Sequence, residues 1–414
     1  MLPLLTKAVE HHYPVGVVGI IAPRNYPLTL AVSDAIPALL AGNSVVLKPS
    51  EETPFTALLA VSLFREAGLP EDVLQVVTGH GSTIGPPLIE QSNFLMFTGS
   101  IETGKTVARQ AGANLTKCSM ELGGKNPLVV FDDADLAKAT EGAIRGCFTN
   151  AGQLCISLER CYAQSSVRDE FERRFVAAVE DLELGTSLDY GPDVGSLASA
   201  DQLEKVKSHV ADAREKGATV LTGGEARPDV GPYFYEPTVL ADVTPDMTVA
   251  SGETFGPVVA LYEFDSTRGA IERANDSDRG LNASVWTADS ERGHAVAERV
   301  ECGTVSINEA YIAAWGSLDA PMGWDEGVGT RPASRPGGHP EVHRIPDGRR
   351  TARGPARRAA WRPRTSLREG DDGRAARDEA DSWASVRPQV TALRRFRCEQ
   401  RDAFVPGPRN FCRA

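Results

Sequence analysis

The chain has 414 residues, of which 41 % are hydrophobic and 24 % are charged, and its formal net charge is −12. A chain of this size can bury a large core and is expected to form two or three domains. No apolar run reaches the length of a membrane-spanning helix, about 18 residues, and the first residues do not resemble a signal peptide. We therefore expect a soluble, cytoplasmic protein with no membrane partner. Seven scattered cysteines, without a CxxC spacing or paired histidines, predict neither a disulfide framework nor a metal site.

Strands and helices alternate through much of the chain. The runs with strand-like composition are 15–21, 44–48, 73–77, 94–97, 126–131, 280–286 and 303–308. The helical patterns are a segment that runs through Leu40, residues 53–67, a helix that ends near Cys155, and residues 205–216. Strands that alternate with helices indicate a parallel sheet, so the predicted fold class is α/β.

The last part of the chain, from Trp324 to Ala414, has a different composition. It contains 20 Arg, no Lys and 12 Asp plus Glu, a net charge of +8, which leaves −20 for the first 323 residues. A basic segment can bind nucleic acid. This one lacks hydrophobic periodicity and contains a single isoleucine, Ile345. Such a composition buries too little apolar surface to offset chain entropy, so we expect a disordered tail and no nucleic-acid partner.

Cys155, within the run 150–157, has the sequence surroundings of a nucleophile. A thiol that attacks a carbonyl carbon needs a route to the thiolate, a donor for the oxyanion and a base for water. Asn25, in a proline-rich turn, offers the amide donor, and Glu121, before two glycines, offers the base. The alternatives are a buried structural cysteine, a turn-capping asparagine and a solvated carboxylate at a strand end.

Residues 99–106 read Gly-Ser-Ile-Glu-Thr-Gly-Lys-Thr and match the phosphate-binding P-loop pattern. An apolar run precedes them, as it does in P-loop proteins. Asp132, at the end of another apolar run, would then hold magnesium, and Lys105 would bind phosphate. The pattern alone leaves a P-loop nucleoside triphosphatase open.

Five separated motifs in a fixed order make the chain resemble the NAD(P)-dependent aldehyde dehydrogenase superfamily from about Tyr13 to about Gly323. The motifs are residues 23–27, 48–51, 97–100, 121–124 and 152–155, and a sixth follows at 253–257. The resemblance implies an incomplete, Rossmann-type cofactor domain over 1–121, an α/β catalytic domain over 122–323, and the tail over 324–414. It also implies that residues 99–104 form the turn that approaches the cofactor pyrophosphate, with the P-loop match as coincidence.

The resemblance implies an oxidoreductase reaction in two stages. Cys155, as a thiolate, adds to the aldehyde, and the thiohemiacetal passes hydride to the nicotinamide while Asn25 and the backbone N–H of Cys155 stabilise the oxyanion. Glu121 then activates the water that hydrolyses the thioester to a carboxylic acid. The three implied catalytic residues are therefore Asn25, Glu121 and Cys155.

The same resemblance implies a binding site for NAD, with NADP possible, and no metal. Lys48 and Glu51 are implied to hold the adenosine ribose, and a carboxylate at this position favours NAD because it repels a 2′-phosphate. Glu253 is implied to orient the nicotinamide ribose. The implied cofactor-binding residues are Ala22, Pro23, Lys48, Ser50, Glu51, Gly81, Phe97, Thr98, Gly99, Ser100, Gly104, Leu122, Glu253 and Phe255.

Residues 155–160, 234–238 and 315–318 resemble the actinobacterial succinate-semialdehyde dehydrogenase branch of the family, which implies succinate semialdehyde as the substrate. Two positions depart from the family pattern. Ser33 stands where better-known enzymes of this activity place an arginine for the substrate carboxylate, and Arg24 stands where the family has an aromatic residue. The alternatives are a broad-range aldehyde dehydrogenase and an inactive remnant of one.

The two ends of the chain also depart from the family. Relatives carry a long segment before the Asn25 motif, so we expect Met1 to be an internal start. After Gly323 the glycine-rich motif and terminal strand of the family are missing. Residues 343–349 can be encoded by codons that, read one base later, spell Thr-Glu-Ser-Gln-Thr-Val-Ala, similar to that strand, and this predicts a frameshift near Gly323. Because this strand pairs with a neighbouring subunit in relatives, we expect the homo-oligomer of the family to be impaired here.

Overall fold

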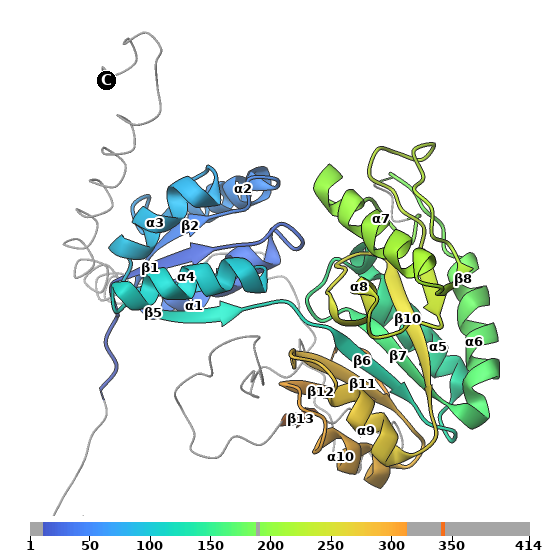
Figure 1. Ribbon diagram of the computed structural model, residues 1–414. Coiled ribbons are helices and arrows are strands. Elements are labelled where there is room, and N and C mark those ends of the chain that lie inside the picture. Colours follow the sequence, from blue (N-terminus) through green and yellow to red (C-terminus); the bar gives the residue numbers. More distant parts are fainter. Residues whose placement is uncertain (1–10, 188–190, 313–340, 344–414) are drawn as a thin grey trace, which may run out of the picture. The chain divides into compact units, whose positions relative to one another are not determined.

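The computed structural model describes residues 11–187, 191–312 and 341–343 (Figure 1). They form two compact units. The described residues of the first unit are 11–96 and 109–118, and those of the second are 97–108, 119–187, 191–312 and 341–343. The predicted domain boundary after residue 121 stays a prediction. The predicted disordered tail lies outside the described residues, except that Glu341–His343 form a strand.

The first sheet has five strands in the order β3-β2-β1-β4-β5. These are β1 (Val17–Ile21), β2 (Ser44–Lys48), β3 (Leu74–Val76), β4 (Phe94–Thr98) and β5 (Lys117–Glu121). The helices between them are α1 (Thr29–Leu40), α2 (Pro54–Glu66), α3 (Gly81–Gln91) and α4 (Ile101–Ala113). β1 pairs with β2 and β2 with β3 in parallel, as the alternation of strands and helices predicts.

Helices cover both faces of this first sheet. Successive side chains on a strand point to opposite faces, so β1 and β2 build two separate apolar clusters. One cluster joins these strands to Ala35 of α1 and Val61 of α2. In the other, Val17 and Val46 pack with Leu88 of α3. The arrangement is that of a doubly wound α/β domain.

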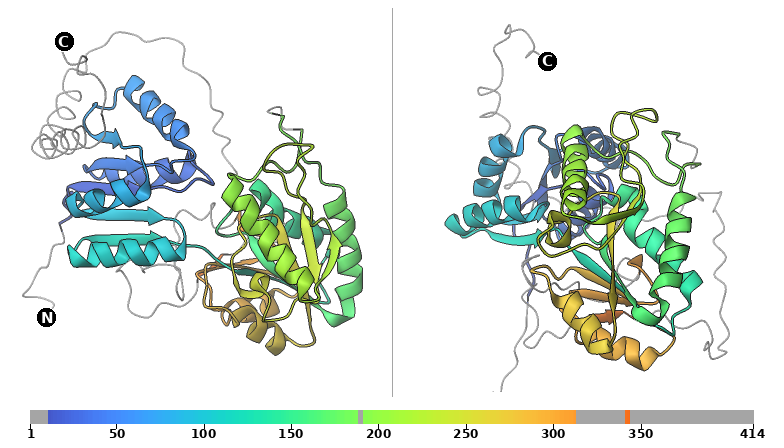
Figure 2. Two further views of the ribbon diagram at one scale, coloured as in Figure 1. Left: turned by 45° about the horizontal axis from the view of Figure 1, so that its top comes forward. Right: turned by 45° about the vertical axis from the view of Figure 1, so that its right-hand side comes forward.

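The second sheet has eight strands in the order β13-β12-β11-β6-β7-β10-β9-β8 (Figures 1 and 2). They are β6 (Asn126–Val130), β7 (Leu158–Gln164), β8 (Thr219–Thr222), β9 (Thr238–Ala241), β10 (Val258–Phe264), β11 (Asn282–Trp286), β12 (Thr304–Ile307) and β13 (Glu341–His343). The helices are α5 (Leu136–Phe148), a 3-10 turn (Thr149–Gly152), α6 (Ser165–Glu180), α7 (Ala200–Glu215), α8 (Thr248–Ser251), α9 (Thr267–Asn275) and α10 (Ser290–Ala297). The strand pairs are parallel, except that β8 and β9 are antiparallel.

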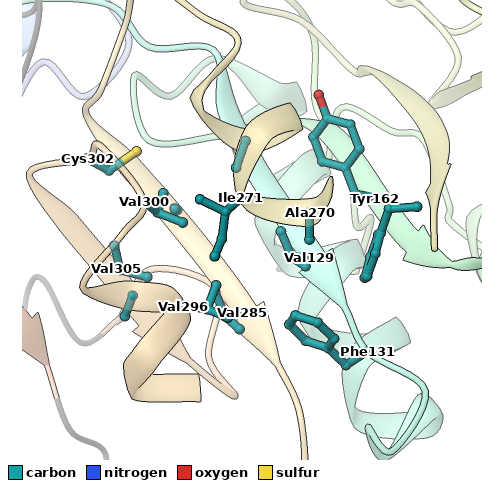
Figure 3. Packing of buried hydrophobic residues seen from close by; sticks show 14 residues of the cluster. Val129, Phe131, Tyr162, Ala270, Ile271, Val285, Val296, Val300, Cys302 and Val305 are labelled. Atoms are coloured by element: carbon teal, nitrogen blue, oxygen red, sulfur yellow. The ribbon is translucent and has the colours of Figure 1, made fainter. Parts of the chain in front are cut away.

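One face of the second sheet is covered by α7, α9 and α10. Val258, Ala260 and Phe264 of β10 are an even number of residues apart, so their side chains share that face. Val258 and Ala260 pack in one cluster with Val206 of α7. Phe264 packs in a second cluster with Ile271 of α9 and residues of α10, β11 and β12. Figure 3 shows this cluster, with Ile271 and Val285 among its labelled residues. The core of the second unit therefore lies between these helices and the sheet.

The opposite face is covered by α5 and α6. Val285 and Trp286 are neighbours on β11 and point to opposite faces. Val285 belongs to the α9 cluster, whereas Trp286 packs against α5 so closely that a Cβ on Gly142 would collide with the indole ring. Phe148 at the end of α5 stacks on Phe175 of α6, with ring centroids 6.1 Å apart. This packing fixes the end of α5, from which the chain enters the Cys155 turn.

Each of the seven strands predicted from the sequence overlaps a strand of the structure, and the helix predicted at 205–216 overlaps α7. Strands β5, β7, β8, β9, β10 and β13 and helices α3, α6, α8, α9 and α10 were not predicted. Among the described residues, no helix combines the length and apolarity needed to cross a bilayer.

Candidate active site

Cys155 lies in a tight turn between the 3-10 turn and β7. Asn150, Ala151 and Gly152 precede it in left-handed conformations, with φ of 54°, 54° and 70°. A Cβ at Gly152 would collide with the backbone carbonyl of Gly256, so glycine alone fits this position. The left-handed turn ends the helical segment and sets Cys155 two residues ahead of a buried serine that begins the run into β7.

Two buried asparagines hold the backbone around the thiol. Asn126, at the start of β6, donates from Nδ2 to the carbonyl oxygens of Cys155 at 2.8 Å and Ser157 at 2.7 Å. Asn282, at the start of β11, donates to the carbonyl of Ile156 at 3.1 Å, and its own N–H donates to Oδ1 of Asn126 at 3.0 Å. Sequence reasoning missed both residues. Their one signal was a polar side chain at the first position of an apolar strand.

The structure brings Glu121 and Glu253 within electrostatic reach of the half-buried Cys155. Burial, and then the negative charges of these two glutamates, raise the pKa of the Cys155 thiol to about 12. In the free protein the sulfur is therefore a thiol at neutral pH. Glu121 is the last residue of β5 and is half-buried, and Leu122 separates it from the paired glycines.

The carboxylate of Glu253 lies against the paired glycines that follow Glu121. Its Oε1 accepts from the backbone N–H of Gly124 at 3.2 Å, and a Cβ on Gly123 would collide with it. Burial raises the pKa of Glu253 to about 7, with a further contribution from the negative charge of Glu159, while nearby cations oppose the shift. Glu253 is thus close to half-ionised at neutral pH.

The turn from β4 into α4 is closely packed. Gly99 donates its backbone N–H to the carbonyl of Glu121 at 3.0 Å. A Cβ at Gly104 would collide with Leu122, and the Phe97 ring lies beside both glycines. Thr98 ends β4, and Ser100 accepts from the backbone N–H of Thr103 at 3.3 Å. The predicted residues Phe97, Thr98, Gly99, Ser100, Gly104 and Leu122 therefore gather around one turn.

The same segment does not form a P-loop. A P-loop wraps several backbone N–H groups around a phosphate before its helix begins. Here α4 already begins at Ile101, so the lysine and threonine of the motif lie inside the helix. Lys105 pairs with Glu102 at 3.4 Å, and the hydroxyl of Thr106 donates to the carbonyl of Glu102 at 3.2 Å. The geometry disfavours the triphosphatase.

In the first unit, Lys48 and Glu51 form a pair beside the start of α3. Lys48 is 2 % exposed, and its Nζ donates to the carbonyl of Pro49 at 3.0 Å and to Oε2 of Glu51 at 3.2 Å. Partial burial works to raise the pKa of Glu51, but backbone N–H groups, that of Gly81 among them, and Lys48 outweigh it and hold the pKa below its ordinary value. Ser50 accepts from a backbone N–H at 3.3 Å. These predicted residues do lie together.

The predicted residues after β1 also belong to the first unit. Ala22 is buried, and its N–H donates to the carbonyl of Lys48 at 2.9 Å, so it continues the pairing of β1 with β2. Pro23 and Asn25 follow, half-buried. The guanidinium of Arg24, which replaces the aromatic residue of the family, pairs with Glu52 at 3.2 Å. A carboxylate therefore offsets the positive charge next to Asn25.

Residues 4–326 match the aldehyde dehydrogenase family, a span that contains Cys155 and both of its glutamates. The chain belongs to the aldehyde dehydrogenase family. The resemblance inferred from the motifs is thus confirmed, and so is the aldehyde dehydrogenase-like α/β fold.

Two curated members of the family are similar to this chain in sequence. A protein of Mycolicibacterium smegmatis, whose provisional name is succinate-semialdehyde dehydrogenase (NADP⁺), is 51 % identical over 333 residues, which cover 80 % of this chain and 64 % of the relative. A succinate semialdehyde dehydrogenase of Acinetobacter baylyi is 40 % identical over 309 residues, 74 % of this chain and 64 % of the relative. The chain spans less than two thirds of the length of these aldehyde dehydrogenases.

Solved structures of the family show the same fold. An aldehyde dehydrogenase of Bacillus cereus in complex with NAD⁺ is similar with a TM-score of 0.74 and 40 % identity, over 77 % of this chain and 65 % of that one. A betaine aldehyde dehydrogenase of Staphylococcus aureus in complex with NAD⁺ has a TM-score of 0.72 and 37 % identity, over 77 % and 63 %. An NADP-dependent enzyme of Escherichia coli has a TM-score of 0.73 and 40 % identity, over 77 % of this chain and 66 % of that one.

Proposed function

We propose that this chain oxidises an aldehyde to a carboxylic acid with a nicotinamide dinucleotide as the hydride acceptor. The observation that carries the proposal is that the carboxylates of Glu121 and Glu253, from two other segments of the second unit, act electrostatically on the Cys155 thiol of a family member. A thiol with two carboxylates beside it offers both a nucleophile and a base for the two stages of the reaction.

The proposed roles follow from the positions of these side chains. Sγ of Cys155 passes its proton to water and bonds to the aldehyde carbon. The backbone N–H of Cys155 stabilises the oxyanion that forms on the former carbonyl oxygen. Once bound, the nicotinamide supplies the hydride acceptor. Glu121 then takes a proton from water, which attacks the thioester carbon and releases the acid and the thiol. Asn25 is proposed, from its motif alone, as the second oxyanion donor.

The residues of each unit fit a dinucleotide. The ionised Glu51 can accept from ribose hydroxyls, and Lys48 beside it is a buried cation. Ser100 stands at the N-terminus of α4, where free N–H groups and the helix dipole favour phosphate. In the second unit, Glu253 and Phe255 are proposed to face the nicotinamide ribose. The full proposed set is Ala22, Pro23, Lys48, Ser50, Glu51, Gly81, Phe97, Thr98, Gly99, Ser100, Gly104, Leu122, Glu253 and Phe255.

We further propose NAD as the preferred cofactor, with NADP accepted. An ionised Glu51 repels a 2′-phosphate, whereas the Mycolicibacterium relative is named for NADP⁺. The ratio of kcat/KM for the two cofactors tests this preference. The proposed substrate is succinate semialdehyde, which both curated relatives carry in their names. Ser33, an exposed residue of α1, offers no cation for its carboxylate, so a broad aldehyde range is the alternative.

The test is formation of reduced nicotinamide by the purified chain with NAD and a panel of aldehydes that includes succinate semialdehyde. Cys155→Ala is expected to abolish turnover, and Cys118→Ala, which removes a half-buried thiol of β5, is expected to retain it. Turnover that survives Cys155→Ala would refute the nucleophile. A folded chain that binds no NAD and oxidises no aldehyde would instead be an inactive remnant. We also propose, from sequence alone, a cytoplasmic location and impaired homo-oligomerisation, which light scattering can measure.

A further inference from the structure

A buried ion pair links the segment after Glu121 to β7. Nζ of Lys125 lies 2.5 Å from Oε2 of Glu159, and the two side chains are 1 % and 4 % exposed. Burial works to raise the pKa of Glu159, but Lys125 and the backbone N–H groups of Thr254 and Phe255 outweigh it and hold the pKa below its ordinary value. Glu159 is therefore an anion inside the core. Because buried pairs contribute little net stability, the other contacts of Glu159 are the better guide to its role.

Glu159 also binds the turn that contains Glu253. Its two oxygens accept from the backbone N–H groups of Thr254 and Phe255, each at 2.9 Å. On the carbonyl side of the same turn, Gln202 of α7, which is 4 % exposed, donates to Thr254 at 3.0 Å and Phe255 at 2.9 Å. Both polar edges of the turn are thus bound by buried side chains. They hold Phe255 at φ 55°, a conformation that a phenylalanine rarely adopts.

The turn returns Glu253 to the backbone that follows Glu121. Its carboxylate accepts from Gly124, the residue that precedes Lys125, so the ion pair and the turn close a ring of contacts. We infer that Glu159 is a positioning residue, which fixes the turn so that the Glu253 carboxylate is preset for the nicotinamide nucleotide. The inference rests on the proposed function, because it takes Glu253 to face the nucleotide.

Several charged groups face Glu253 from the elements packed around it. Burial is the largest cause of the raised pKa of Glu253, and the negative charge of Glu159 on β7 is the second. The pKa is lowered by two cations, Arg279 before β11 and Lys205 of α7, and by the N–H of Gly124. Cys155 is the neighbouring acid, and Glu121 acts on that thiol as well. His209 of α7, which contacts the Thr254 hydroxyl at 3.1 Å, has its pKa lowered to about 4, chiefly by burial, and is neutral near pH 7. Among these charged groups, Glu159 has the largest effect on the pKa of Glu253.

The experiment measures the dissociation constant of NAD by calorimetry, without any aldehyde, for the full chain and two variants. In Glu159→Gln, an amide NH₂ replaces one acceptor oxygen and meets either the Lys125 ammonium or a backbone N–H, so the turn must shift. The double variant Lys125→Met with Glu159→Met removes both buried charges and the acceptors of the turn. Because apolar side chains of similar volume replace the ion pair, it keeps the fold where the single variant is destabilised. Glu180→Gln, at the exposed end of α6, is the matched control.

We expect the dissociation constant of NAD to rise about tenfold in both variants, the effect of one lost charge-assisted hydrogen bond, and to stay unchanged in the control. In the wild type, affinity should increase as pH rises through about 7, where Glu253 ionises. Glu159→Gln removes a negative charge, so the midpoint should fall. The double variant removes one charge of each sign, so its midpoint should move less. A residue with a purely structural role would lower the thermal transition and leave the affinity for NAD unchanged in the variants that stay folded.

The outcomes separate the two proposals. If the double variant keeps its thermal transition and binds NAD as tightly as the wild type, Glu159 does not position Glu253 and only this inference is lost. The wild type is measured between pH 6 and pH 9, a range of about 3 pH units that includes the ionisation of a group with a neutral pKa. If it binds no NAD anywhere in this range, both the proposed function and this inference are wrong.

Discussion

The Cys155 turn and the Lys48–Glu51 pair differ in how deeply the groups that hold the functional side chain are buried. Around Cys155 the backbone carbonyls are bound by buried asparagines, and the neighbouring turn is held by other buried side chains. At the other region only the lysine is buried, and the Glu51 side chain is 44 % exposed. Changes near Cys155 should therefore disturb the fold and the chemistry together. Changes at Glu51 should disturb ligand affinity alone.

Asn126→Leu tests this dependence with the largest expected effect. The substitution keeps the volume but leaves the carbonyls of Cys155 and Ser157 and the N–H of Asn282 without partners. We expect a loss of about 3 kcal/mol or more in unfolding free energy, because buried unpaired groups cost about 1–3 kcal/mol each. Denaturant unfolding measures the loss.

The control is Asn275→Leu, which removes two similar bonds, to Arg299 and Glu301, at a half-buried position where water can replace them. Its expected cost is below about 1 kcal/mol. Equal losses in the two variants would show that the burial of the Cys155 turn has no special importance.

Comparing the stability of Gly152→Ala and Gly217→Ala separates the cost of backbone strain from the cost of a steric clash. Both glycines are left-handed, with φ of 70° and 98°, so alanine costs about 1–2 kcal/mol at either one. At Gly152 the new Cβ also meets the carbonyl of Gly256, whereas nothing lies within 4 Å at Gly217. We expect Gly152→Ala to lose about 1–3 kcal/mol more, by thermal or denaturant unfolding, and to lose activity as well. Matching losses would contradict the close approach.

Glu51→Gln tests the exposed region. It should raise the KM for NAD about tenfold, since a ribose hydroxyl then faces a neutral acceptor, and leave kcat and unfolding free energy nearly unchanged. The KM for NADP should rise less, because the negative charge that repels the 2′-phosphate is gone. Steady-state kinetics with both cofactors measures this, with Glu66→Gln on exposed α2 surface as control. A large loss of stability would contradict the contrast between the two regions.

Glu121→Gln should change thiol reactivity and turnover in opposite directions. Removing its charge lowers the Cys155 pKa from about 12, so more thiolate is present at every pH below that value. Alkylation by iodoacetamide at pH 8 should therefore become about threefold faster, while loss of the base slows turnover. Mass spectrometry of the Cys155 peptide over time gives the rate. Alkylation that slows would show that Glu121 promotes the thiolate in the free protein.

The sequence was sufficient for the family, the fold class and most strands because short motifs and apolar runs are local. It did not show the groups that hold the site. The contact from Glu159 to Thr254 spans 95 residues, and that from Asn282 to Asn126 spans 156. Glu159 was visible within the motif after Cys155, yet its partners lie on other segments. The P-loop match was misleading because the pattern is purely local. The same residues also fit a helix that begins at Ile101, too early for a loop that wraps around a phosphate.

Trp286 gives the second unit an optical reporter. Of the five tryptophans it is the one within the described residues, and its indole N–H donates to Ser284 at 2.8 Å inside the core. Indole emission moves to longer wavelength when water reaches the ring. The ring rests on Gly142 of α5, the helix that leads into the Cys155 turn. In a variant whose other four tryptophans are replaced by phenylalanine, the emission maximum of Trp286 therefore registers whether that helix is packed on the sheet. The emission maximum of this one indole thus reports the packing of the helix that precedes Cys155.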